Sequence, residues 1–196
     1  MREREAQVLK KASFCEIVSR KGAKAQRKPK KDSSILSFTR LILLACWFGA
    51  ALFFGAVVAP AAFSVLRSFG LANANEIAGS IVTRSLSVIN LAGFAIALLL
   101  LVTIILRRNA SGRTSIIVEC ICLGVIALAT GVGHWLIAAR MRALRAAMVL
   151  PIDQIAADDP RRVAFNNLHG YSVNALGLAM IAALVAMVLM ARSLRN

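Results

Sequence analysis

The sequence predicts an all-α integral membrane protein, a four-transmembrane-helix antiparallel bundle that follows a disordered basic N-terminal arm. The 196 residues are 59% apolar with a mean hydropathy of +0.72, whereas soluble proteins are about 45–50% apolar. Four stretches without a charged side chain each reach the roughly 20 residues that a helix needs to cross a bilayer. No segment shows the period-two alternation of a membrane β-strand, so we expect helices.

The predicted arm covers residues 1–36. Its first part, Met1–Asp32, is rich in Lys and Arg, and Phe14 is its one aromatic residue. Because aromatic side chains for stacking on bases are otherwise missing, the arm does not predict nucleic-acid binding. A basic segment before a first membrane helix instead orients the protein and attracts anionic lipids.

Residues 37–196 form the predicted transmembrane domain, with helices at about 38–66, 80–107, 114–149 and 160–192. Each range contains one uncharged stretch, and charged or polar segments separate them. Asp159 followed by Pro160 predicts the start of the last helix, because aspartate caps a helix and proline is favoured in its first turn. Asn75 is expected to cap a turn that leads into the second helix.

The distribution of Lys and Arg predicts the orientation. With the N-terminus in the cytoplasm, the arm, the second connection and the C-terminus place most of these residues inside, as the positive-inside rule requires. Both termini are therefore expected in the cytoplasm. This prediction depends on the charge of the arm.

Small residues recur every four positions on the first and fourth helices. Faces of this kind let membrane helices approach closely, so we expect a compact bundle and, as a possible partner, a second copy of the chain. The residues concerned are Ala51, Gly55 and Ala59, and Ala175, Ala179 and Ala183.

Glu119 is the carboxylate that falls inside a predicted span. Steps of three or four residues place it on one helix face with Thr130 and His134, and this face should look into the bundle. Two interpretations stay open. The stripe could form a proton or cation path, or Glu119 could pair with Arg113 or Arg108 near the interface while Thr130 bonds to its own helix.

His134 and His169 are expected at similar depth on adjacent helices, near the outer side. Two imidazoles could bind a transition metal or haem iron, although interhelical hydrogen bonds are the simpler role. Ser172 should share the inward face of His169, and Asn174 should find a partner on the second helix. Asn90 or Ser87 is the expected partner.

Catalytic motifs are absent from the sequence: it contains no phosphate-binding glycine loop and no zinc-type cluster of cysteine and histidine. The four cysteines are widely spaced or, at Cys120 and Cys122, on different sides of a helix. No cofactor is predicted from the residues. A membrane redox, metal-dependent or haem-dependent enzyme that uses His134 and His169 stays the alternative.

FNNLHGYSVNALGL, from Phe165 to Leu178, resembles the closing motif of a bacterial four-helix membrane family, domain of unknown function 4149, which is related to the eukaryotic transmembrane protein 205 group. WFGAALFFGAVVAPAAFSVL (47–66) and AGSIVTR (78–84) are similar to its first span and its entry into the second. The resemblance covers about Arg40 to Ala191. It implies a small multi-pass protein of the bacterial inner (plasma) membrane, with a role such as handling or sensing a solute or metal ion.

Overall fold

The structure is a computed structural model that describes residues 31–106 and 113–195. The chain divides into two units, residues 1–36 and 37–196. Most of the first unit, and with it most of the predicted arm, lies outside the described residues. Residues 31–36 are helical, whereas the sequence predicted disorder up to residue 36.

The described elements are helices, and no strand occurs in residues 31–106 or 113–195. These elements form four long helical segments in the described residues. The first segment consists of α2, η1 and α3, and the second is α4. The third consists of α5, η2 and α6, and the fourth is α7. Their bounds are α2 Lys31–Phe53, η1 Phe54–Val58, α3 Ala59–Ser68, α4 Ala74–Leu106, α5 Arg113–Gly131, η2 Val132–Ile137, α6 Ala138–Ala146, η3 Ile152–Gln154 and α7 Pro160–Arg195.

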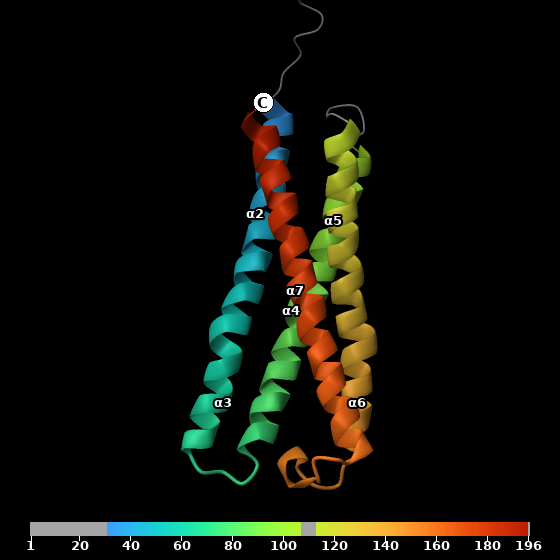
Figure 1. The fold of residues 1–196 in the computed structure, drawn as a ribbon. Helices are drawn as coiled ribbons and strands as arrows, with labels where there is room; N and C mark the ends of the chain where they lie inside the picture. Colours follow the sequence, from blue (N-terminus) through green and yellow to red (C-terminus); the bar gives the residue numbers. More distant parts are fainter. Residues whose placement is uncertain (1–30, 107–112, 196) are drawn as a thin grey trace, which may run out of the picture. The chain divides into compact units, whose positions relative to one another are not determined.

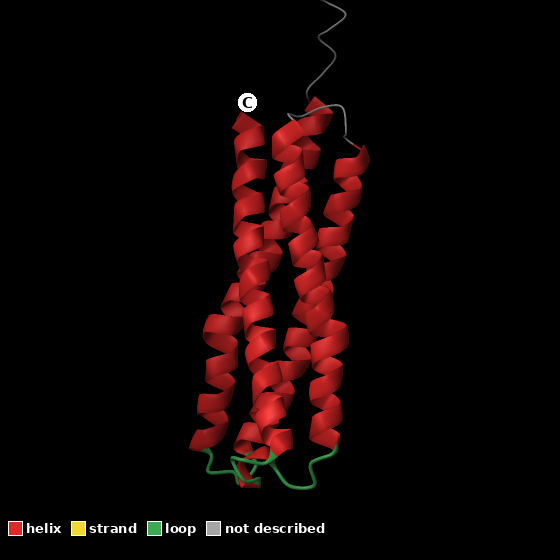
Figure 2. Cartoon of the chain, turned by 45° about the vertical axis from the view of Figure 1, so that its right-hand side comes forward, coloured by secondary structure: helices red, strands yellow, loops and turns green. Residues whose placement is uncertain are grey.

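In the unit of residues 37–196, consecutive long helices run antiparallel and pack side by side (Figures 1 and 2). α4 contacts α3 and α5, and α5 contacts α7. The end of α4 and the C-terminus lie at one end of this unit, which we call the terminal end. The α3–α4 turn and the α6–α7 connection lie at the other, which we call the loop end. The predicted all-α four-helix architecture is confirmed.

Four helical segments in the described part of the chain are long and apolar enough to cross a membrane. These segments are Ile35–Ser68, Ala74–Ile105, Ser115–Ala146 and Pro160–Leu194. The second helix begins at Ala74, earlier than the predicted residue 80. The polar residues of its first turns, which resemble a loop in the sequence, continue the helix beyond the apolar stretch.

The starts of α4 and α7 show how local sequence sets helix boundaries. The Asp159 carboxylate accepts a hydrogen bond from the Arg161 backbone N–H at 2.7 Å, and Pro160 is the first residue of α7, as predicted. Asn75 does not cap α4. It lies inside the helix, and its side-chain oxygen accepts a hydrogen bond from Arg67 at 2.7 Å.

A buried apolar cluster fills the terminal half of the unit and joins all four long helices. Its members include Leu44, Trp47, Leu100, Leu123, Ile126, Ala179, Ala183 and Met190. The alanine face of α7 is therefore packed inside the bundle. The face predicted on the first helix is not continuous: Ala51 is buried but Gly55 is exposed. Gly55 lies in the π-helical segment η1, which changes the helical phase.

Trp47 connects the first long helix to the second through a hydrogen bond and a close packing contact. Its indole N–H donates a hydrogen bond to the Ile89 carbonyl oxygen at 2.9 Å, and its ring covers Gly93. A Cβ atom at Gly93 would lie 2.6 Å from the indole. The absence of a side chain at this position is what lets the two helices approach.

Candidate functional site

Glu119 lies near the terminal end and forms a buried ion pair with Arg40 of α2. The exposed fractions are 9% for Glu119 and 6% for Arg40. The Arg40 Nε atom is buried without a hydrogen-bond partner among the described residues. The side chains of the predicted partners, Arg108 and Arg113, lie outside the described residues. The observed partner belongs to a helix 79 positions away in the sequence.

The polar stripe predicted on the third helix does face inward for most of its length. Leu123, Ile126 and Thr130 are each at most 1% exposed. The Thr130 hydroxyl donates to the Ile126 carbonyl at 2.6 Å, so its polar group is satisfied within its own helix. This observation favours a structural role for Thr130.

His134 lies in the π-helical segment η2 and contacts Ser87 of α4. Its Nδ1 atom lies 3.0 Å from the Ser87 hydroxyl oxygen and 3.1 Å from the Ser87 carbonyl oxygen. Because a carbonyl can only accept, the tautomer that satisfies both contacts carries its proton on Nδ1. The hydroxyl then accepts from the same N–H or donates elsewhere.

His169 lies in α7 and lines an open groove at the loop end. The structure records no contact between its ring and His134. No group of three or more His, Cys, Asp or Glu side chains that could hold a metal ion occurs among the described residues. Metal or haem binding by the two histidines stays a prediction.

The groove has a volume of about 1080 Å³ and is lined by α3, α4, α6, α7 and the connection before η3. Its charged side chains are four arginines and one carboxylate. Glu76 pairs with Arg145, and Arg67 donates to Asn75. For Arg84 and Arg142, no hydrogen bond or ion pair is recorded with any described residue. We call this feature the arginine groove, after Arg67, Arg84, Arg142 and Arg145.

Apolar side chains make up much of the remaining wall of the arginine groove. They come from α3, α4, α6 and α7 and from the connection after α6, and they include Phe63, Val82, Met141, Met148 and Phe165. An open site with an apolar wall and several cationic groups suits an anion that also carries an apolar body.

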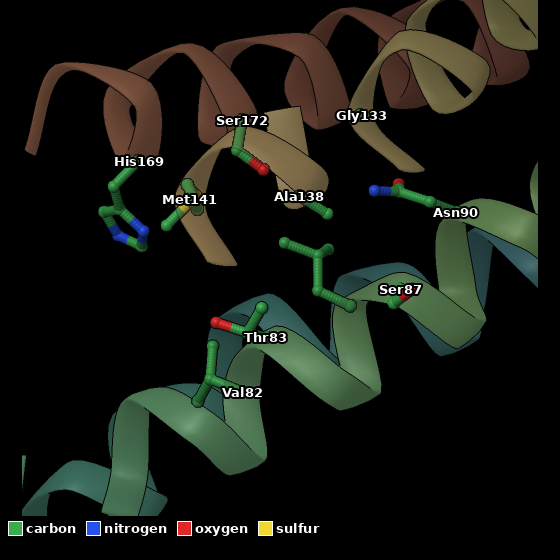
Figure 3. A pocket seen from close by; sticks show the side chains of 10 residues that line it. Val82, Thr83, Ser87, Asn90, Gly133, Ala138, Met141, His169 and Ser172 are labelled. Atoms are coloured by element: carbon green, nitrogen blue, oxygen red, sulfur yellow. The ribbon is translucent and has the colours of Figure 1, made fainter. Parts of the chain in front are cut away.

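A second, much smaller cavity of about 20 Å³ adjoins the arginine groove, with which it shares Val82, Thr83, Ser87, Met141 and His169. Figure 3 shows its walls: α4 contributes Ser87 and Asn90, and α7 contributes His169 and Ser172. Asn90 is 4% exposed and Ser172 is 6% exposed. We call this space the polar cavity.

The predicted arrangement of His169, Ser172 and Asn174 in the last helix is therefore partly correct. Ser172 is buried as predicted, whereas His169 is exposed, although both line the same cavity with Met141 of the third long helix (Figure 3). Asn174 is exposed, and the prediction that Asn90 or Ser87 bonds to it is wrong. Ser87 contacts His134, and the Asn90 amide packs against Gly133, where a Cβ atom would lie 2.8 Å from Nδ2.

In the sequence, the groove arginines were considered only as part of the Lys and Arg distribution that predicts membrane orientation. A signal was nevertheless present, because Arg84, Arg142 and Arg145 lie within helical segments that are long and apolar enough to cross a membrane. Ionisable residues in such positions often mark sites. What the sequence could not show is that tertiary packing gathers them around one groove.

Comparison with known proteins gives one family. Residues 42–149 match the family described as "Domain of unknown function (DUF4149)". No match was found among curated proteins or among solved structures.

Proposed function

Since the chain belongs to the DUF4149 family and is a multi-pass membrane protein with four spanning helices, we propose that it handles a small anionic solute, which binds in the arginine groove. The observation that carries this proposal is the charge of the groove: four arginines and one carboxylate line it. Two of the arginines, Arg84 and Arg142, have no recorded partner among the described residues.

The different pairing of the arginines supports a division of roles. Arg145 is held by Glu76, and Arg67 is held by Asn75 and lies over the Phe63 ring, 5.8 Å from its centroid. These contacts fix the walls of the groove. Arg84 and Arg142 are exposed and are the cations left for a ligand.

The size and the lining of the groove support an amphiphilic ligand. Small-molecule sites usually measure about 300–1,000 Å³, so a groove of about 1080 Å³ has room for more than an inorganic anion. The phenylalanine and methionine side chains of the wall would cover an apolar body, while a guanidinium would bind a carboxylate or phosphate.

The test is a binding measurement on the purified protein in lipid nanodiscs with three ligands of equal chain length: decanoate, decanol and decylammonium. We expect saturable binding of decanoate and at least tenfold weaker binding of the other two. An exposed charge pair contributes about 0.2–1 kcal/mol, and 1.4 kcal/mol corresponds to a factor of ten in affinity. Because the Arg84→Gln/Arg142→Gln variant loses two guanidinium groups, it should bind decanoate about twofold to thirtyfold more weakly.

Arg192→Gln is the matched control, because Arg192 is an exposed arginine in α7 that does not line the groove. It should leave decanoate binding unchanged. Equal binding of all three ligands would contradict the proposal, since the groove would then not select the anion. An equal loss in the control and the double variant would also contradict it.

For the location we propose the bacterial inner membrane with both termini in the cytoplasm, so that the arginine groove opens on the outer side. The support is the Lys and Arg distribution, including the basic arm with its expected contacts to anionic lipid. A solute would then enter the groove from outside.

A further inference from the structure

Asn90 and Ser172 are buried polar side chains that face each other across the polar cavity. Both are more than nine-tenths buried, and no hydrogen bond to another described residue is recorded for either side chain. In Figure 3 the Asn90 amide and the Ser172 hydroxyl point from α4 and α7 into the same space. Buried polar groups almost always have a partner, so a partner must come from within the cavity.

We propose that the polar cavity is a binding site for a single water molecule, held by the Asn90 amide and the Ser172 hydroxyl. The volume supports one water: the cavity measures about 20 Å³, and one water requires about 10–15 Å³. A buried water needs two to four polar partners. Thr83, Ser87 and His169 also line the cavity and supply further polar groups that could bind the water.

The charge of the cavity selects water over an ion. Its polar lining consists of hydroxyl, amide and imidazole groups, with no carboxylate among the residues that border it. The charged lining of the adjoining groove is four arginines and one carboxylate, an excess of positive charge that disfavours a cation. A neutral ligand that both donates and accepts hydrogen bonds fits this set of groups.

Gly133 makes the site possible. It lies in the π-helical segment η2 and lines the cavity, and a Cβ atom at this position would lie only 2.8 Å from the Asn90 Nδ2 atom. π-helical segments occur frequently at functional sites. Here the segment brings Gly133 against Asn90 and His134 against Ser87, two residues that lie on the same face of α4.

The water would have a defined place between the groove and the interior. On one side it would contact His169, which also lines the arginine groove. On the other it would lie beside Ser87, whose hydroxyl contacts His134. It would thus connect the open groove with Ser87 and, through the Ser87 hydroxyl, with His134.

The test is proton NMR of the full chain in lipid nanodiscs, with a measurement of cross-relaxation from water to the Asn90 side-chain NH₂ group. We expect a direct water cross-peak in the wild-type protein. Ser172→Ala removes one of the groups that hold the water and should reduce this peak at least twofold. The control is Ser193→Ala, because the Ser193 hydroxyl bonds to the Met190 carbonyl of its own helix at 2.8 Å; this variant should keep the full peak.

Ala138→Val provides a second route, because Ala138 lines the cavity and a larger side chain should displace the water without removing a polar group. The proposal is overturned if the wild-type protein shows no water cross-peak at Asn90, or if the peak stays full in both cavity variants. It is also overturned if replacing choline chloride with sodium chloride shifts the Asn90 signals saturably, since the occupant would then be a cation.

Discussion

The buried pair of Arg40 and Glu119 gives the sharpest prediction for stability. Glu119→Gln keeps the shape of the side chain but removes its charge. Arg40 would then stay charged, because a guanidinium does not lose its proton in proteins. It is only 6% exposed, and its Nε atom already has no partner among the described residues.

The expected magnitude follows from this geometry. Removing one partner of a buried pair costs about 3–5 kcal/mol, whereas replacing both with apolar residues is often neutral or stabilises by about 1–4 kcal/mol. We therefore expect Glu119→Gln to lower the free energy of unfolding by about 3–5 kcal/mol. The double variant Arg40→Met/Glu119→Leu should be at least as stable as the wild type.

The assay is equilibrium unfolding in mixed micelles with increasing sodium dodecyl sulfate, followed by tryptophan fluorescence. Ser193→Ala serves as a control that touches only an intrahelical hydrogen bond. A loss below about 1 kcal/mol for Glu119→Gln, within the usual range of exposed pairs, would refute the reasoning. So would a double variant that is as unstable as Glu119→Gln alone.

Three other predictions follow from the fold. Gly93→Ala should place a methyl group against the Trp47 indole. Overpacking of this kind should lower the free energy of unfolding by about 1–3 kcal/mol, and a thermal melt in micelles can measure the loss. An unchanged melting temperature would contradict the prediction and show that the indole moves aside. Asp159→Ala should speed hydrogen exchange of the first amides of α7, because the carboxylate caps this helix. Hydrogen bonds from the Arg161 side chain, and then from its backbone N–H, hold the pKa of the Asp159 carboxyl below its ordinary value. The stabilisation of the helix start by this carboxylate is therefore complete above about pH 3.9 and is lost as the pH falls through the lower folded-state pKa. A difference between Asp159→Ala and the wild type that grows in acid would contradict this. An impermeant maleimide added to intact cells should leave Cys15 unlabelled until the cells are permeabilised, and labelling without permeabilisation would reverse the proposed orientation.

A prediction for the histidines separates the two classes of function. Purified wild-type protein and His169→Ala can be compared by absorption spectroscopy and elemental analysis. A Soret band, or stoichiometric copper, iron or zinc that is lost in the variant, would favour a redox or metal-dependent enzyme that uses His134 and His169. Equal spectra and metal contents would favour solute handling.

The sequence was sufficient for the features that depend on one helix at a time. Uncharged stretches predicted the four spans, because their length must match the bilayer. The cap at Asp159 predicted the start of α7, and the 3.6-residue period predicted the buried face that contains Glu119 and Thr130. Each of these depends only on neighbours within about one helical turn.

Features that depend on two helices were predicted poorly. The partner of Glu119 is Arg40, from another span, and no local pattern identifies it. The error at Asn174 has the same origin: a helical wheel gives its angle from His169 but not which direction faces a neighbouring helix. The groove at Arg84 and Arg142 likewise exists only after α4 and α6 have come together.

The two π-helical segments have a consequence for how the chain tolerates insertions and deletions. A π-helical turn contains one residue more than an α-helical turn, and one residue corresponds to a rotation of about 100°. Because the wider π-helical turn takes up one residue locally, deleting a single residue from Val132–Ile137 would restore an α-helical turn and leave Met141, Arg142 and Arg145 on nearly the same helix face. A relative that lacks this one residue would keep the bundle and the groove arginines, but it would lose the local widening that places Gly133 beside Asn90 and His134 beside Ser87.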